Sequence, residues 1–388
     1  MADRFRVLLL HNIMAPYRFP LFRAIAGHPD IDLTVWFMSR SAKNRRWAAS
    51  QQELGFKYEV LPSVELNYRS QDLFTYIVNY TFPWRYARHP FDVLISAGWL
   101  DFACQAGFFI SKLLGRKFVL WSESTAYEPS LQRTLAAPLV KTMVRGTDAC
   151  VSVGTRSKEY LHALGASSQK IFTAYSTVDV ELFQRVSATA RAHRIEHRAA
   201  LGIRRRHVLL YCGQFIERKG LRYLLKAFAL IKCEYEDVAL VMVGYGPEHS
   251  RLLEEVTRLG LSDVHLLGHV EVADMPKMYA LADVFVLPST EETWGLVVNE
   301  AMACGLPLIV TDRVGSSVDL LRDGENGYLV PVADPASIAD RTLRLLKDPQ
   351  LVARMSECSK QRIKQFTPEH AAEGFLEAVR HAISMTAG

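Results

Sequence analysis

Residues 284–310 read VFVLPSTEETWGLVVNEAMACGLPLIV, and they carry the strongest evidence for the fold in the sequence. It opens with the apolar run Val284–Leu287, which has the length and residue types of a buried strand. A helix is predicted to follow and to end at Cys304, because Gly305 is a typical helix stop. The apolar run Leu308–Val310 then adds a second strand. A strand, a helix and a strand in succession indicate a parallel sheet.

The same alternation of short apolar runs and helical patterns extends over most of the chain. It is typical of α/β layering around parallel sheets, and it predicts two doubly wound domains. The predicted strands are Arg6–Leu10, Leu33–Phe37, Val93–Ser96, Phe118–Trp121, Ala149–Val153, His207–Cys212, Val238–Val243, Val264–Leu266, Val284–Leu287 and Leu308–Val310.

The length of 388 residues also predicts two domains, at roughly 100–200 residues each. The arginine-rich stretch Ser187–His207 shows little apolar periodicity at its start, so we place the boundary there. We expect an N-terminal domain over residues 1–190, a C-terminal domain over 191–367 and a last helix within 368–388. Ligands of open parallel sheets bind outside the carboxyl ends of the strands, so functional residues are expected in the strand-end loops, facing a cleft between the domains.

The composition is that of an ordinary soluble globular protein, with 49% apolar and 22% charged residues. Six cysteines without a C-x-x-C pair argue against a disulfide scaffold or a structural zinc site and favour a reducing compartment. The apolar run Val7–Leu10 is too short for a signal peptide, and no window approaches the ~18 apolar residues of a spanning helix. We expect a cytoplasmic protein, or one peripheral on the inner face of the membrane.

The net charge of +5 is unevenly distributed. Residues 1–190 hold 22 Lys and Arg against 15 Asp and Glu, and the rest of the chain holds 24 against 26, so the halves carry +7 and −2. The basic half favours an anionic partner such as a phosphate-bearing substrate, an acidic lipid surface or nucleic acid. Aromatic and basic residues interleave from Phe74 to Phe91, which suits a lipid surface, although aromatic core packing of a helix is at least as good an interpretation. A separate basic cluster comprises Lys43, Arg45, Arg46 and Trp47.

Two carboxylates flank the start of the predicted helix in 284–310. Glu292 lies in the loop before the helix, and Glu300 about one and a half turns inside it. A carboxylate accepts two hydroxyl donors, which matches the vicinal hydroxyls of a sugar or ribose. The helix start suits a phosphate, and Gly295 allows a ligand to approach closely. The alternative is that Glu291 and Glu292 are first-turn acids and that Glu300 is a solvated helix residue.

A second loop follows the predicted strand His207–Cys212 and reads GQFIERKG. It carries Arg218 and Lys219, two adjacent cations that suit a diphosphate, although a lone basic pair is more often solvated surface. The helix after it has apolar residues on one face: Leu221, Leu224, Leu225 and Phe228.

A third loop places Gly244 and Gly246 at the end of the predicted strand Val238–Val243. The G-x-G pair alone is weak evidence for a dinucleotide, and a tight turn is the alternative. His269 follows the next strand and is interpreted as a loop histidine rather than a base.

Taken together, these loops resemble a known family. Glu292 and Glu300 with AMACGLP at 301–307, Gly213 to Gly220, and G-x-G-P at 244–247 are similar to the retaining GT-B glycosyltransferases of the glycosyl transferases group 1 family (family 4, glycogen synthase-like). The resemblance is close over residues 200–345 and weaker before them. It implies an α/β fold of GT-B architecture, with two Rossmann-like doubly wound domains facing a cleft and a C-terminal helix that crosses back to the first domain.

The resemblance also implies roles for individual residues. Glu292 would contact hydroxyls of the transferred sugar near C3, Glu300 would bind the ribose, and Lys219 would hold the diphosphate. Gln214 stands where the family usually has Arg, so Arg218 is the candidate for the missing charge. The other implied nucleotide contacts are the backbone N–H groups of Gly295, Leu296 and Val297, main-chain contacts to the base at His269 and Val270, and the glycines Gly213, Gly244 and Gly246.

The first domain departs from the family pattern. The segment from His11 to Arg18 replaces a glycine pair that often follows the first strand, which leaves the acceptor contacts there undefined. Glu123 falls where many members carry a His near the donor sugar. It is our third candidate catalytic residue, after Glu292 and Lys219, and a helix-capping acid is the alternative. Asp30 and Asp32 match a metal-binding D-x-D but are interpreted as turn residues, and no metal or other cofactor is expected.

The resulting hypothesis is retaining transfer of a hexose from a UDP- or GDP-sugar to a hydroxyl of a glycan, lipid-linked or cell-envelope acceptor. A nucleotide-sugar epimerase or a phosphorylase on the same scaffold is the alternative within enzymes. A non-catalytic sugar-nucleotide-binding partner is the alternative outside them. An anionic membrane surface is a possible partner, and nucleic acid is not expected.

Overall fold

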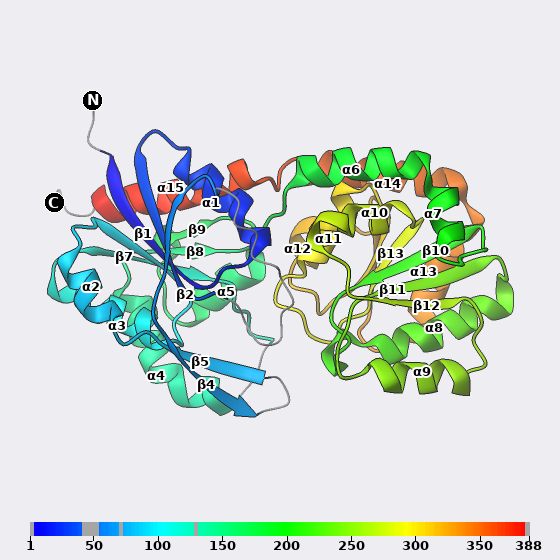
Figure 1. Cartoon of the computed structure of the whole chain (residues 1–388), viewed down its shortest axis with the longest axis horizontal. Helices are drawn as coiled ribbons and strands as arrows, with labels where there is room; N and C mark the ends of the chain where they lie inside the picture. Colours follow the sequence, from blue (N-terminus) through cyan, green and yellow to red (C-terminus); the bar gives the residue numbers. More distant parts are fainter. Residues whose placement is uncertain (1–3, 41–53, 70–72, 128–130, 385–388) are drawn as a thin grey trace. The chain divides into compact units, whose positions relative to one another are not determined.

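The computed structural model describes residues 4–40, 54–69, 73–127 and 131–384, which form two compact units. Unit 1 comprises residues 1–177 and 368–388, and unit 2 comprises residues 178–367. Each unit is a parallel sheet covered by helices on both faces (Figure 1). The basic cluster at residues 43–47 lies outside the described residues.

The main sheet of unit 1 has seven strands in the order β3-β2-β1-β6-β7-β8-β9, all paired in parallel. In that order, the strands are Lys57–Val60, Ile31–Ser39, Phe5–Ile13, Val93–Ala97, Lys117–Ser122, Ala149–Ser152 and Ile171–Thr173. A separate antiparallel hairpin joins β4 (Val64–Arg69) and β5 (Leu73–Val78). The helices are α1 (Phe19–Ala26), α2 (Phe82–Arg88), α3 (Phe102–Leu113), α4 (Leu131–Gly146), α5 (Thr155–Ala163) and α15 (Pro368–Ser384), with 3-10 turns η1 (Pro16–Arg18) and η2 (Ser168–Lys170).

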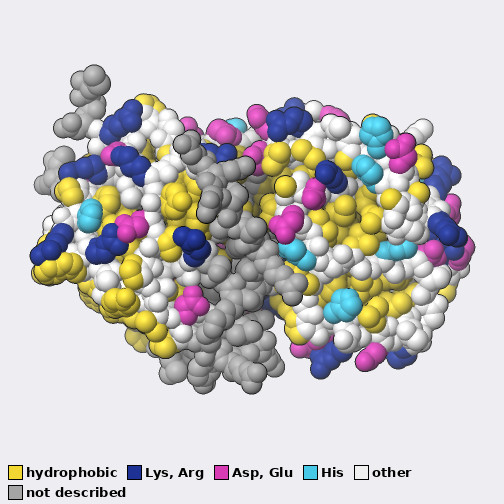
Figure 2. Space-filling view, viewed as in Figure 1, with side chains coloured by type: hydrophobic (Ala, Val, Ile, Leu, Met, Phe, Trp, Pro, Cys, Tyr) yellow, Lys and Arg dark blue, Asp and Glu magenta, His cyan; other side chains and the backbone are white. Residues whose placement is uncertain are grey.

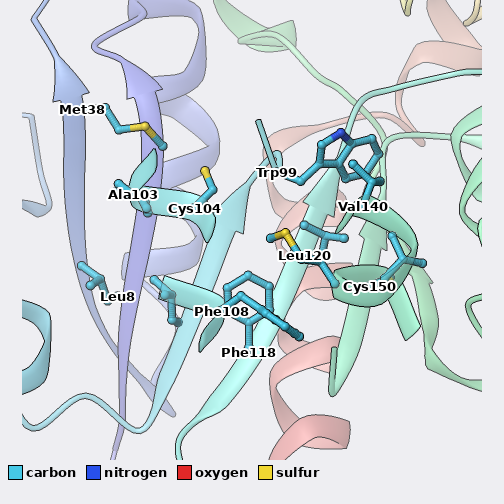
Figure 3. Close-up of a cluster of buried hydrophobic side chains, with 14 of the residues drawn as sticks. Leu8, Met38, Trp99, Ala103, Cys104, Phe108, Phe118, Leu120, Val140 and Cys150 are labelled. Atoms are coloured by element: carbon cyan, nitrogen blue, oxygen red, sulfur yellow. The ribbon is translucent and has the colours of Figure 1, made fainter. Parts of the chain in front are cut away.

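The core of unit 1 forms because apolar side chains of α3 and the sheet face each other (Figure 3). Cys104 and Phe108 are four residues apart on α3, so they share one helix face and pack with Leu8 and Phe118 from the strands. Burying one such large side chain contributes about 1.5–3 kcal/mol. This packing fixes the sheet whose strand ends carry the loops of unit 1.

The sheet of unit 2 has six strands in the order β12-β11-β10-β13-β14-β15, also paired in parallel. In that order, the strands are Val264–Gly268, Val238–Val243, His207–Cys212, Val284–Leu287, Leu308–Thr311 and Gly327–Val330. The helices are α6 (Val180–Ala192), α7 (Arg194–Ala200), α8 (Leu221–Glu234), α9 (His249–Arg258), α10 (Met275–Ala280), α11 (Leu296–Ala303), α12 (Ser317–Leu320), α13 (Pro335–Lys347) and α14 (Pro349–Ile363), with 3-10 turns η3 (Glu217–Lys219) and η4 (Val272–Asp274).

All of the predicted strands are present, and the α/β class with two Rossmann-like sheets is confirmed. Three strands were not predicted, β3, β9 and β15, which are edge strands of three or four residues. The hairpin strands β4 and β5 were not predicted either. The stretch from Phe74 to Phe91 contains part of β5 and the short helix α2. Aromatic core packing is confirmed for Phe82 and Tyr86 of α2, which are fully buried.

The boundary between the units differs from the predicted position near residue 190. Contacts divide the chain between Thr177 and Val178, because α6 packs against α10 and α11 and so belongs to unit 2. The last helix, α15, belongs to unit 1, as the resemblance implied. It packs against α1, β7, β8 and β9, with the ring of Phe375 edge-on to Trp121 at 5.0 Å. Within the described ranges, no helix combines the length and the apolar character needed to cross a bilayer.

Candidate functional site

The loops after β10 and β13 of unit 2, which were predicted to contact the diphosphate, are hydrogen-bonded to each other. The carbonyl oxygen of Arg218 accepts a bond from the backbone N–H of Thr290 at 2.8 Å and one from its hydroxyl at 3.1 Å. Gly220 has a φ of 66°, and a Cβ there would lie 2.2 Å from the carbonyl oxygen of Pro288. Only glycine therefore permits this close approach, which carries Lys219 to the loop of Glu292.

Lys219 and Glu292 form an ion pair at this junction. The Nζ of Lys219 contacts Oε2 of Glu292, and the two side chains are only 10% and 12% exposed. The main chain of Glu292 is held on both sides, since its N–H donates to Arg313 O at 3.2 Å and its carbonyl accepts from Gly315 N at 2.9 Å. A cation and a carboxylate are thus fixed together in a largely buried place.

The helix α11 begins directly after this pair. Gly295 precedes its first residue with a φ of 90°, and a Cβ there would lie 3.2 Å from Cγ of Glu292. The loop is closed by Trp294, whose indole N–H donates to Oδ1 of Asn299 at 2.9 Å in a buried bond. Leu296 and Val297 form the first turn, where backbone N–H groups lack partners within the helix. The helix start thus lies beside the Lys219–Glu292 pair.

Glu300 lies further along α11 and is not a solvated residue. The hydroxyl of Tyr279, a fully buried residue of α10, donates to Oε2 of Glu300 at 2.7 Å. Burial raises the pKa of Glu300 from 4.5 to about 7, and the bond from Tyr279 opposes part of that rise. Tyr279 was not predicted as a site residue, because an aromatic residue in an apolar helix is normally interpreted as a core residue.

The remaining predicted nucleotide residues lie on the loops after β10, β11 and β12, three neighbouring strands. A Cβ on Gly244 would lie 1.8 Å from the carbonyl oxygen of Gly213, and one on Gly246 would lie 2.3 Å from that of Phe215. The glycines therefore make a tight, closely packed turn. His269 follows β12 with Nε2 3.4 Å from Oε1 of Glu271, and Val270 comes next.

Unit 1 has a second cluster around Glu123, at the end of β7. Arg18 Nη2 donates to Oε1 of Glu123, and Nη1 donates to Ser176 Oγ at 3.3 Å. Arg18 is only 3% exposed, and its guanidinium lies 5.0 Å from the ring centre of Trp121 and 5.2 Å from that of Tyr17. Glu123 thus pairs with an arginine, and no helix begins among the described residues 123–127. Arg18 was not predicted as a site residue, and the one sequence feature that could have indicated it was its position in the loop after the first strand.

Asp30 and Asp32 have ion-pair partners. Asp30 lies in the turn before β2 and pairs with Arg380 at 2.5 Å, which lowers the pKa of its carboxyl group. Asp32 pairs with Lys57 at 2.6 Å. Asp30 is a turn residue, as predicted, but the turn interpretation is wrong for Asp32, which is the second residue of β2.

Comparison with known proteins gives one family. The model of the family described as glycosyl transferases group 1 matches residues 193–362. The N-acetyl-alpha-D-glucosaminyl L-malate synthase of Bacillus anthracis is 31% identical over 245 residues, 62% of this chain and 60% of that protein. A D-inositol 3-phosphate glycosyltransferase of Corynebacterium urealyticum is 31% identical over 230 residues, 57% of this chain and 54% of that protein. The chain therefore spans less than two thirds of the length of either relative.

Among solved structures, the chain is similar to Anabaena Alr3699/HepE in complex with UDP, with a TM-score of 0.79 and 20% identity over 97% of this chain and 100% of that one. The same Anabaena protein has also been solved with UDP-glucose. At this identity the likeness establishes the fold, which is GT-B.

Proposed function

Through residues 193–362 the chain belongs to the glycosyl transferases group 1 family, and on this premise we propose that it transfers a hexose from a UDP- or GDP-sugar to an acceptor hydroxyl with retention of anomeric configuration. The observation that carries the proposal is the buried contact of Lys219 with Glu292 at the start of α11, with Glu300 on the same helix. The UDP and UDP-glucose complexes of the Anabaena protein support a nucleotide-sugar donor.

In the proposed complex, the diphosphate binds at the start of α11. Lys219 supplies a positive charge there, and the backbone N–H groups of Gly295, Leu296 and Val297 supply donors at the positive end of the helix dipole. Arg218 is a second cation on the same loop. The diphosphate would share Lys219 with Glu292, so one oxygen of Glu292 becomes an acceptor for hydroxyls of the transferred sugar.

Glu300 is proposed to hold the ribose. An ionised carboxylate can accept from two vicinal hydroxyls, while Tyr279 OH occupies one site on Oε2. Ribose hydroxyls donate best to the ionised form, so nucleotide binding would lower the raised pKa of Glu300. The loops at Gly213, Gly244, Gly246, His269 and Val270 would surround the base.

The proposed reaction takes place on one face of the sugar. The acceptor oxygen forms a bond to C1 as the bond from C1 to the diphosphate oxygen breaks, and the hydroxyl proton passes to that leaving oxygen. Lys219 and the helix start stabilise the charge that develops on the leaving group. Glu123 is proposed to orient the acceptor hydroxyl, and the proposed reaction uses no metal or other cofactor.

The names of two relatives contain L-malate and D-inositol 3-phosphate, both hydroxylated anions. Together with the excess of +7 in residues 1–190, they support an acceptor with hydroxyl and anionic groups. A glycan, a lipid-linked sugar or a cell-envelope polymer can carry both.

A panel of UDP- and GDP-sugars tests the function. We expect one donor to be hydrolysed slowly alone and faster with a hydroxylated acceptor, with release of the nucleoside diphosphate and retention at C1 by NMR. A change of sugar identity without diphosphate release would identify an epimerase, and a strict need for inorganic phosphate a phosphorylase. Binding without turnover of any donor would favour the non-catalytic partner. The variant Lys219→Met is the negative control for turnover.

We also propose that unit 1 binds anionic membrane surfaces through α2 and α3, which pack on each other. Trp84, Phe109 and Leu113 are 61%, 52% and 84% exposed. Arg88 lies over the Trp84 ring at 3.4 Å, and Lys112 is exposed next to Leu113. In Figure 2, hydrophobic and basic side chains meet along the edge of unit 1 where Figure 1 places α2. Apolar and cationic side chains on one surface suit an anionic headgroup layer.

A further inference from the structure

Unit 1 has a cavity of about 300 Å³ at the carboxyl ends of β1, β6 and β7. These strands are neighbours, and the chain order of the sheet reverses between β1 and β6. Ligands of open parallel sheets bind at such a reversal. The lining side chains that matter here are His11, Tyr17, Arg18, Trp121 and Glu123.

Arg18 brings more hydrogen-bond donors to the cavity than the structure satisfies. A guanidinium has five N–H donors. Within the described part of the chain, its only hydrogen-bond acceptors are Glu123 Oε1 and Ser176 Oγ, and its Nε has none. A buried cation is costly unless its donors are paired. The group is thus suited to an additional oxygen-rich anion.

The carboxylate that pairs with Arg18 is the more replaceable partner. The side chain of Glu123 is 44% exposed, whereas that of Arg18 is 3% exposed. If Glu123 moves away, water can solvate its carboxylate, but water cannot reach the buried guanidinium of Arg18 to take the place of the carboxylate. An anionic group of a ligand would take the place of Glu123 on the guanidinium.

The rest of the cavity suits a hydroxylated compound. His11 Nδ1 lies 2.9 Å from the carbonyl oxygen of Ile13, which can only accept, so Nδ1 carries the proton. Burial and the charge of Arg18 lower the pKa of His11 to about 3, so the ring is neutral and its Nε2 is an acceptor. A neutral acceptor beside a buried cation matches a ligand that has both a hydroxyl and an anionic group.

We propose that this cavity binds a hydroxylated anion, a polyol or sugar that carries a phosphate or carboxylate, with Arg18 pairing with the anionic group and His11 accepting from a hydroxyl. The inference rests on the proposed function, because this compound would be the acceptor of the transferred sugar. It adds to that function the place in unit 1 where the acceptor binds and the residue that selects its anionic group.

Calorimetry on the whole chain tests the proposal with three probes: D-inositol 3-phosphate, L-malate and uncharged inositol. We expect at least one anion to bind the wild type at least about tenfold more tightly than inositol. Arg18→Gln should abolish that preference, and Arg18→Lys should retain part of it. Arg6→Gln is the matched control, because Arg6 is also paired with a carboxylate, Asp92, but at the start of β1. It should bind like the wild type.

Glu123→Gln is the second variant and keeps Arg18 in place. Because the carboxylate no longer competes, we expect its anion binding to be several-fold tighter than that of the wild type. The proposal is overturned if neither anion binds the wild type at millimolar concentration, if inositol binds as tightly as the anions, or if Glu123→Gln leaves anion binding unchanged or weaker. UDP binding measured on the same samples separates the two proposals, since UDP should bind the wild type and Arg18→Gln alike. Loss of UDP binding in the wild type would contradict the proposed function instead.

Discussion

Each unit holds a buried cation paired with a glutamate, but only in unit 2 is the glutamate side chain buried as well. In unit 2 the side chains of Lys219 and Glu292 are 10% and 12% exposed. In unit 1 Arg18 is 3% exposed, while Glu123 is 44% exposed. Both side chains of the unit 2 pair are therefore buried, whereas in unit 1 only that of Arg18 is.

The difference indicates two kinds of site. Removing one partner of a buried ion pair leaves the other charge buried away from water, so Lys219 and Glu292 each stabilise the other's charge. Glu123 can be solvated without Arg18, so this carboxylate is exchangeable. In the proposed function, unit 2 would therefore hold the donor in a fixed arrangement, and unit 1 would offer a buried cation whose counterion a ligand replaces.

The largest effect is expected from Lys219→Met. Turnover should fall at least about a hundredfold with loss of the diphosphate contact, and stability should fall by about 3–5 kcal/mol because the buried carboxylate of Glu292 loses its ion pair with Lys219. Diphosphate release and thermal unfolding measure both. The double variant Lys219→Met with Glu292→Gln should recover stability but not turnover. Arg18→Gln should lose less stability than Lys219→Met, and equal losses would remove the distinction between the pairs.

The next effect separates the two glutamates of unit 2. Glu300→Gln should weaken nucleotide binding by about 1.5–3 kcal/mol, since a charged acceptor for ribose hydroxyls is lost. Glu292→Gln should mainly lower kcat, because it is assigned to the reacting sugar. Calorimetry with UDP or GDP and steady-state kinetics on the same variants would decide. Equal losses of nucleotide affinity would contradict the division.

The protonation of Glu300 predicts a pH dependence. Its pKa is raised from 4.5 to about 7, so the unfolded chain releases this proton at lower pH than the folded chain does. The contribution of Glu300 to stability therefore falls as pH rises from 4.5 to about 7. Nucleotide binding, which uses the ionised form, should strengthen between about pH 6 and pH 8. The nucleotide titrates in the same way with both proteins, so subtracting the pH profile of nucleotide affinity for Glu300→Gln from that of the wild type removes its contribution. If no pH-dependent difference remains, Glu300 does not titrate on binding the nucleotide.

A smaller effect is expected from Arg218→Ala. The carbonyl of residue 218 holds Thr290, and alanine retains that backbone bond. Turnover should fall by roughly tenfold at most, less than in Lys219→Ala, because one charge-assisted contact to the diphosphate is lost while the buried Lys219–Glu292 pair stays in place. Steady-state kinetics of the two alanine variants give the order. The reverse order would mean that Arg218 takes the role of the arginine that Gln214 replaces.

The smallest effect concerns the membrane surface of unit 1. Vesicles with anionic lipid should bind the protein at low salt, and Arg88→Ala with Lys112→Ala should weaken binding by about 1 kcal/mol per residue. Arg222→Ala with Lys226→Ala removes two exposed charges from α8 of unit 2 and is the control. Arg85 is left intact, because its side chain is only 27% exposed and pairs with Glu59 at 2.6 Å, whereas Lys112 is 38% exposed even though it pairs with Asp148 at 2.9 Å. Sedimentation unaffected by the unit 1 variant alone would contradict this surface.

The sequence alone predicted the inner strands of both sheets, because each is an apolar run buried on both faces. It missed β3, whose residues Lys57–Val60 are exposed or half-buried and so lack that signal. It missed β15, which contains Gly327, and β9, which has three residues. Short edge strands form because an adjacent strand is there to pair with, and their own residue pattern does not predict them.

Spacing along the chain was enough to predict the local parts of the candidate site: the loop and helix that carry Glu292 and Glu300, the basic loop with Lys219, and the glycine turns. Each of these parts lies within its own continuous stretch of sequence. The contact of Lys219 with Glu292, 73 residues away, and that of Arg18 with Glu123, 105 residues away, appear only in the folded chain. Neighbouring parallel strands bring their carboxyl ends to one edge, so residues distant in sequence become partners there. Burial of a charge depends on that packing, and residue spacing does not encode it.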